Sequence, residues 1–260
     1  MKITKRLSGL VLVAFLMASC TTNPKKETEE LNEITNKNKS TIMKTESEQI
    51  VNVAFFYIKP GHEEQFEKLR SRGNVLLEKY GAKIERVIKP KMLAEGELEL
   101  PTEIHFASYP NIEAKKAFDQ DPEFLELKKE YVAGSVEKMF GFITKNDDME
   151  YFREIGDSKK TYGLALVYIN DNEKSKHDFA EYHKEACAIM PEFGTHFERF
   201  LIPFEKANNL IEQPSEIHLF YFDSEEGLMK MGSDERMAAL FPKRNASMSN
   251  LIFIIGEAIQ

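Results

Sequence analysis

The 260-residue sequence has no tryptophan, only two cysteines and no apolar run long enough to span a bilayer. With Cys20 and Cys187 alone, the chain can form at most one internal disulfide and cannot build a cysteine-rich zinc module. No GxGxxG, GxxxxGK[ST], GxSxG or HExxH motif is present, so redox-dinucleotide, ATP-dependent and serine-hydrolase functions have no support. The 43 Asp and Glu outnumber the 35 Lys and Arg, which argues against a nucleic-acid partner.

The first twenty residues have the pattern of an export signal. Lys2, Lys5 and Arg6 precede a short apolar stretch, residues 7–18, which ends just before Ser19-Cys20. Small residues directly before a cysteine resemble the lipobox of bacterial lipoproteins, in which the cysteine is acylated, although Met17 stands where leucine is usual. We therefore expect a signal peptide over 1–19 and lipidation of Cys20. An ordinary secretory signal, with Cys20 incidental, is the alternative.

The segment after the cysteine, residues 20–48, is rich in Thr, Asn, Lys and Glu and holds too few apolar residues to fold alone. We interpret it as a flexible tether that holds the folded part near a membrane. The expected location is the bacterial cell envelope, with a lipid anchor in the outer membrane or at the cell surface. Cleavage before Cys20 removes three positive charges, so the net charge changes from −8 to −11. Lipidation leaves Cys187 without a disulfide partner, and we expect a buried thiol there.

The rest of the chain is a tandem repeat. Sliding the sequence along itself by 113 residues gives eleven identities in the forty positions from Phe66 to His105, where unrelated chains give roughly two or three. We therefore expect two repeats, residues 50–145 and 161–260, joined by a charged linker over 146–160.

Each repeat shows the order strand, helix, strand, strand, helix, strand. In the first repeat, residues 51–58 form an apolar run before Pro60-Gly61, and helical spacing of apolar residues follows until Gly81. This is the ferredoxin-like order of an α+β protein, with helices on one face of a four-stranded sheet. The strands are apolar on both sides, so we expect the two bare sheet faces to bury each other.

The first half, with Asp121-Pro122-Glu123 after its third strand, resembles the dimeric α/β-barrel superfamily and most closely its DUF1330-type members. The second half has Asp234-Glu235-Arg236 instead, so its resemblance rests on its kinship with the first half. The resemblance implies an intramolecular pseudo-dimer, in which two sheets close into one barrel with helices outside. Some members degrade haem with a tryptophan that this chain lacks. Others are cofactor-independent monooxygenases, isomerases or mutarotases.

Polar residues that recur in both repeats are the candidate site. The candidate catalytic residues are Glu103, His105, Glu216 and His218, and the candidate substrate-binding residues are Arg86 and Arg199. Glu and His two apart on a strand share one face, where His can act as a general base that Glu orients. We expect Arg86, on the neighbouring strand, to join them and to bind an anionic group. The alternative is that these residues form polar pairs that bridge the two halves.

Other chemistry has weaker support. His183 and Cys187 lie four apart on a predicted helix and share a face, but two ligands do not make a metal site, and Arg70 and Asn74 occupy the matching places. We therefore expect no metal and no cofactor.

Two functions stay open from the sequence. One is an anchored lipoprotein that binds a small molecule and carries out cofactor-free acid/base or monooxygenase-type chemistry. The other is a non-catalytic binding or structural lipoprotein.

Overall fold

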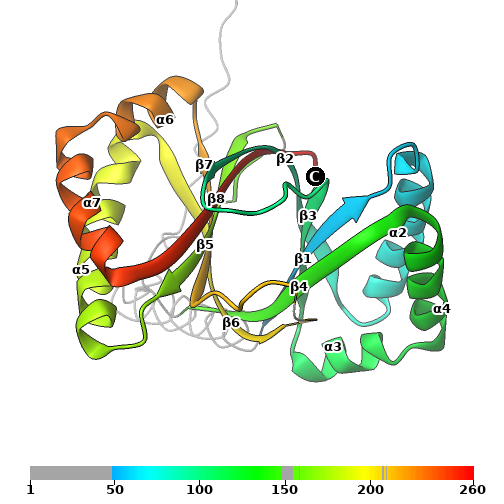
Figure 1. The fold of residues 1–260 in the computed structure, drawn as a ribbon. Helices are drawn as coiled ribbons and strands as arrows, with labels where there is room; N and C mark the ends of the chain where they lie inside the picture. Colours follow the sequence, from blue (N-terminus) through cyan, green and yellow to red (C-terminus); the bar gives the residue numbers. More distant parts are fainter. Residues whose placement is uncertain (1–48, 148–154, 158, 207, 209) are drawn as a thin grey trace, which may run out of the picture. The chain divides into compact units, whose positions relative to one another are not determined.

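The computed structural model describes residues 49–147, 155–157, 159–206, 208 and 210–260 (Figure 1). The predicted signal peptide, Cys20 and the tether up to residue 48 lie outside the described residues, as does most of the predicted linker. Of the helices in the described part, none has the length and apolar character needed to cross a membrane.

The first half contains four strands and three α-helices in the predicted order. They are β1 (Ile50–Ile58), α2 (Glu63–Glu78), β2 (Lys83–Glu95), β3 (Glu103–Tyr109), α3 (Ile112–Asp119), α4 (Pro122–Glu130) and β4 (Val136–Asn146). Helix α4 starts where the sequence predicts, because Pro122 occupies its first turn and the Asp121 carboxylate accepts hydrogen bonds from the amides of Glu123 and Phe124.

The second half repeats this arrangement. Its elements are β5 (Thr161–Ile169), α5 (Glu173–Ile189), β6 (Thr195–Lys206), β7 (Glu216–Phe222), α6 (Glu225–Gly232), α7 (Glu235–Ser247) and β8 (Met248–Ala258). Gly194 ends the turn after α5 with φ of 73°, as Gly81 does after α2 with φ of 67°. Both positions favour glycine because a side chain is strained at positive φ.

The eight strands form one closed antiparallel barrel in the order β1-β3-β2-β8-β5-β7-β6-β4 (Figure 1). Each half contributes four consecutive strands, β4-β1-β3-β2 and β8-β5-β7-β6. Pairing of β2 with β8 and of β4 with β6 joins the two sheets, so no strand is left with a free edge. The predicted fold class, two ferredoxin-like repeats that form an intramolecular α/β barrel, is confirmed.

The interior of the barrel is filled by side chains from both sheets. Phe55 stacks on Phe140 with ring centroids 4.5 Å apart, within a cluster of twenty buried residues from all eight strands. Tyr57 and Tyr168, which match in the repeat, belong to this cluster, and their hydroxyls donate to the carbonyls of Glu99 and Glu212. The tyrosines therefore pack and tie down loops, and burial raises the pKa of each to about 12.

A β-bulge in β2 and another in β6 place a repeated Glu-Arg dipeptide between the sheets. The pairing of β2 with β3 slips between Ile84 and Arg86, and that of β6 with β7 slips between Phe197 and Arg199. A bulge lets two consecutive side chains depart from strict alternation, so glutamate and arginine can both reach the other half.

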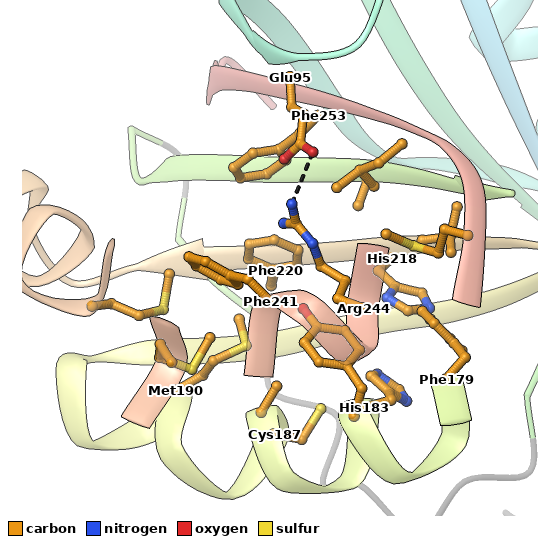
Figure 2. Close-up of a pocket in the computed structure, with 18 of the residues that line it drawn as sticks. Glu95, Phe179, His183, Cys187, Met190, His218, Phe220, Phe241, Arg244 and Phe253 are labelled. Atoms are coloured by element: carbon orange, nitrogen blue, oxygen red, sulfur yellow. Dashed lines mark hydrogen bonds and ion pairs between the residues drawn. The ribbon is translucent and has the colours of Figure 1, made fainter. Parts of the chain in front are cut away.

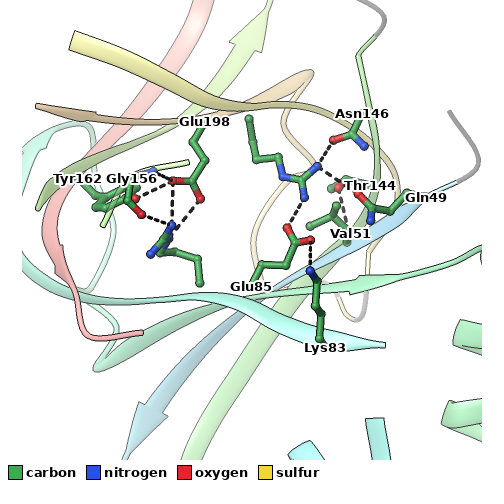
Figure 3. Close-up of polar contacts among 11 residues, drawn as sticks. Gln49, Val51, Lys83, Glu85, Thr144, Asn146, Gly156, Tyr162 and Glu198 are labelled. Carbon is green, nitrogen blue, oxygen red and sulfur yellow. Dashed lines mark hydrogen bonds and ion pairs between the residues drawn. The ribbon is translucent and has the colours of Figure 1, made fainter. Parts of the chain in front are cut away.

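The two dipeptides form reciprocal ion pairs (Figure 3). Arg86 binds Glu198 through Nε at 3.2 Å and Nη2 at 3.1 Å, and Arg199 binds Glu85. Strands β2 and β6 stand opposite each other in the strand order, so these pairs join the two halves across the barrel. Tyr162 adds a 2.6 Å hydrogen bond from its hydroxyl to Glu198.

We predict that Arg86→Met costs about 3–5 kcal/mol of unfolding free energy, because it leaves the buried Glu198 carboxylate without its charge partner. Both residues are 4% exposed. Urea unfolding followed by circular dichroism measures the loss, and the double variant Arg86→Met/Glu198→Gln should recover part of it. The matched control is Lys91→Met in the same strand, whose exposed pair with Glu257 should be worth less than about 1 kcal/mol. If Arg86→Met and Lys91→Met lose the same unfolding free energy, the Arg86–Glu198 pair does not stabilise the contact between the two halves as proposed.

Candidate functional site

The repeated Glu-x-His segments lie on the outer face of the barrel, beneath the helices. In β3, Ile104 and Phe106 belong to the interior cluster, so Glu103 and His105 between them face outward. Strand β7 repeats this pattern. The predicted pairing is present in both halves: Nε2 of His105 lies 2.7 Å from Glu103 Oε2, and Nε2 of His218 lies 2.6 Å from Glu216 Oε2.

Neither Arg86 nor Arg199 joins these pairs, so the predicted grouping of arginine with Glu and His is wrong for these two residues. The bulges direct the side chains of Arg86 and Arg199 toward the opposite half, where they form ion pairs with Glu198 and Glu85. In the first half another arginine takes the place: Nη1 of Arg70, from α2, lies 2.9 Å from Glu103 Oε2. This partner was missed because nothing in the periodicity of α2 shows which charged residue lies over β3.

In the second half, His183 of α5 stands at the position that matches Arg70. Its ring stacks on that of His218 with centroids 4.8 Å apart, and Phe200 meets His218 edge-on at 4.8 Å. The second half thus has a Glu216–His218–His183 group where the first has Glu103–His105–Arg70. In the described part of the chain, no group of three or more His, Cys, Asp or Glu could hold a metal ion.

A cavity of about 250 Å³ lies beside this group, between the outer face of the second sheet and helices α5, α6 and α7 (Figure 2). His183, His218 and Cys187 are in its wall. The remaining wall is mostly aromatic rings and methionines, namely Phe179, Tyr182, Phe197, Phe200, Phe220, Phe241, Phe253, Met190, Met231, Met237 and Met248. Such a wall suits a small apolar molecule that presents a few polar atoms.

The matching region of the first half is packed with aromatic rings. The ring centroid of His105 lies 4.6 Å from that of Phe56 and 5.9 Å from that of Phe66. Tyr131 packs on both phenylalanines. Tyr131 corresponds in the repeat to Arg244, which lines the cavity of the second half. The duplicated site has therefore diverged, and two of the differences change its polar groups: Arg70 against His183 and Tyr131 against Arg244.

Gly163 in β5 shapes the floor of the cavity. A Cβ atom at this position would lie 2.5 Å from the ring of Phe220 and 2.9 Å from that of Phe253. The two rings stack with centroids 5.8 Å apart, and both line the cavity. The missing side chain therefore lets two aromatic rings lie against the sheet and leaves space above them.

The protonation of the group follows from burial and from hydrogen bonds. Burial alone would raise the pKa of Glu216, but the hydrogen bond and charge of His218 hold it below its usual value. Glu216 is thus a carboxylate and accepts a hydrogen bond from Nε2 of His218; in a neutral imidazole, this tautomer leaves the acceptor lone pair on Nδ1. Burial, and then the neighbouring His218, lower the pKa of His183 to about 4, so His183 is neutral near pH 7.

The same balance holds in the first half. Burial would raise the pKa of Glu103, but His105 and Arg70 hold it below its usual value, while burial lowers the pKa of His105.

No protein-family model matches the chain, and no curated protein matches its sequence. Similar solved structures exist. A proposed monooxygenase from Fusobacterium nucleatum subsp. nucleatum has a TM-score of 0.55 at 12% identity, with 82% of this chain and 94% of that chain covered. An anthrone oxidase-like protein has a TM-score of 0.56 at 11% identity, with 82% and 92% covered. A variant of chlorite dismutase from Candidatus Nitrospira defluvii has a TM-score of 0.54 at 7% identity, with 83% and 92% covered.

The chain has the dimeric α/β-barrel fold. Both halves of that barrel are supplied here by one polypeptide. At these identities the likeness extends to the fold alone, and the closer resemblance to DUF1330-type members stays a prediction from the sequence.

We predict that His183 makes the protein less stable as the pH falls from 6.5 to 4. The unfolded chain takes up a proton on this histidine near pH 6.5, whereas the folded protein does so only near pH 4, so the stability gained by burying the neutral ring is complete above pH 6.5 and is lost below it. Between pH 7 and pH 4, the wild-type protein should lose on the order of 3 kcal/mol more than His183→Met. Urea unfolding at both pH values measures this.

The control is His177→Gln on the exposed face of the same helix, which should follow the wild-type pH dependence. If His183→Met and wild type lose the same stability, His183 is not buried as a neutral ring.

Proposed function

We propose that the second half of the barrel binds a small aromatic molecule in the α5–α6–α7 cavity and removes a proton from it with His218, without a bound cofactor. The observation that carries this proposal is the Glu216–His218 pair at the wall of an apolar cavity. A carboxylate that holds Nε2 fixes the tautomer of the imidazole, so that Nδ1 can accept a proton. His183 and the aromatic wall keep water away from the imidazole of His218 and hold that imidazole in place.

Proton removal becomes a monooxygenase-type reaction when molecular oxygen is the second substrate. The electron pair left on carbon passes to O2; one oxygen atom enters the organic product and the other leaves as water. For anthrone, whose methylene protons are acidic, the balanced result is anthraquinone and one water. The structural likeness to an anthrone oxidase-like protein and a proposed monooxygenase supports this reaction class.

We predict that His218→Asn lowers the oxidation of anthrone at least about 100-fold while the thermal midpoint changes little, because general-base catalysis contributes about 10²–10⁴ in rate. Formation of anthraquinone is followed by absorbance under air and under nitrogen. His177→Asn, on the exposed face of α5, should leave the rate unchanged.

Two results would contradict the proposal. A loss of turnover in His105→Asn, with His218→Asn still active, would place the chemistry in the first half. Binding of anthrone without any oxygen-dependent turnover would favour the alternative, a non-catalytic binding lipoprotein.

We also propose that the barrel is attached to a membrane of the bacterial envelope through a lipid on Cys20. The support is the sequence alone: a positive start, a short apolar run and small residues before Cys20. Attachment of this kind would bring the cavity close to apolar compounds that partition into the bilayer.

For the anchor, we predict that Cys20→Ala abolishes incorporation of labelled palmitate in cells and moves the protein from the detergent phase to the aqueous phase in Triton X-114 partitioning. Cys187→Ala is the matched control, because that thiol is on the buried face of α5, and it should keep the label. A protein that stays labelled without Cys20 would contradict lipidation at this residue.

A further inference from the structure

Arg244 brings a positive charge to a cavity whose wall is mostly apolar and also contains the Glu95 carboxylate. Among the described residues that line the cavity, Arg244 is the only arginine or lysine. It comes from the last turn of α7, and Figure 2 shows its guanidinium reaching along the cavity toward Glu95. Its side chain is 16% exposed, and the guanidinium carbon lies 4.9 Å from the centre of the Phe241 ring. The charge is therefore partly dehydrated, which strengthens its attraction for an anion.

The present partner of Arg244 is loosely held. Glu95, at the end of β2 in the first half, accepts a hydrogen bond from Nη2 at 2.9 Å, and its side chain is 42% exposed. Nε of Arg244 donates to Asn245 at 3.0 Å, and the hydroxyl of Tyr182, in the cavity wall, accepts a further hydrogen bond from the Arg244 side chain. An ion pair with so exposed a carboxylate contributes little free energy, so a carboxylate that enters the cavity can displace Glu95 at small cost.

We propose that Arg244 binds an anionic group of the substrate, so that the substrate class is a planar aromatic compound that carries a carboxylate; anthrone, which lacks the carboxylate, represents only the reacting part of such a substrate. The inference rests on the proposed function of the same cavity and gives it a chemical class. The aromatic part of the ligand would lie on the stacked rings of Phe220 and Phe253, above Gly163. The carboxylate would form charge-assisted hydrogen bonds with Arg244 in place of Glu95.

This arrangement makes Glu95 a competitor for the ligand. Because β2 belongs to the first half, the first repeat contributes one carboxylate to the mouth of the site in the second repeat. Removing the charge of Glu95 should tighten binding of an anion, whereas removing the charge of Arg244 should weaken it. If the Arg244–Glu95 ion pair only held the two halves together, neither substitution would change the affinity for an anion in this way.

Calorimetric titration of the full chain with two probes tests the proposal: 2-naphthoate, which is an anion, and 2-naphthamide, which is neutral and of nearly the same shape. We expect Arg244→Gln to weaken 2-naphthoate about tenfold or more and 2-naphthamide less than about threefold, because charge-assisted hydrogen bonds are roughly twice as strong as neutral ones. Glu95→Gln should tighten 2-naphthoate several-fold. The matched control is Lys243→Gln, which removes a charge from the same turn of α7 but from a side chain that pairs with Glu181 and Glu185.

The outcomes separate this inference from the proposed function. If both probes bind and Arg244→Gln weakens them equally or not at all, the carboxylate assignment is overturned while the cavity remains a binding site. If Arg244→Gln does not fold, the Glu95→Gln protein decides: unchanged affinity for 2-naphthoate overturns the assignment. If neither probe binds the wild-type protein, the result contradicts the proposed binding function and, with it, the assignment of a carboxylate to Arg244.

Discussion

Closure of the barrel is the constraint on which the rest of the structure depends. Both four-stranded sheets are apolar on both faces, so each must bury a second face in addition to the one beneath its helices. The inner faces bury each other, and the reciprocal pairs Arg86–Glu198 and Arg199–Glu85 join them. Because side chains from all eight strands fill the interior, the space for a ligand lies on the outer face of a sheet, under the helices.

Duplication placed the same Glu-x-His pair on both outer faces, but the surroundings of the two pairs differ. In the first half, Arg70 neutralises Glu103, and Tyr131 packs with the rings around His105. In the second half, His183 and Arg244 stand at these two positions, and a cavity opens beside His218. A histidine held by a carboxylate is thus a packed element in one repeat and part of a cavity wall in the other. Once the interior of a duplicated barrel is closed, a change in one outer face need not disturb the other.

Much of the fold follows from the sequence. The 113-residue offset gives the two repeats, and the two-sided apolar strands require a second sheet to cover them. The pairing of Glu with His within one strand also follows, because period-two alternation is a local rule. The place of Arg86 does not follow, because a β-bulge reverses the face that alternation assigns, and no residue in the sequence marks the bulge. The contact of Arg244 with Glu95 could not be predicted either, because these residues meet only when α7 of the second half lies over the end of β2 of the first half. The roles of His105, His218 and their glutamates in catalysis stay predictions.

A crystal structure of the protein soaked with 2-naphthoate tests the central claim most directly, namely that the working site is the α5–α6–α7 cavity of the second half. The account predicts electron density for the naphthalene ring above Phe220 and Phe253, close to His218, with the first half unchanged. Density for the ring inside the barrel, or beside His105 in the first half, would contradict it.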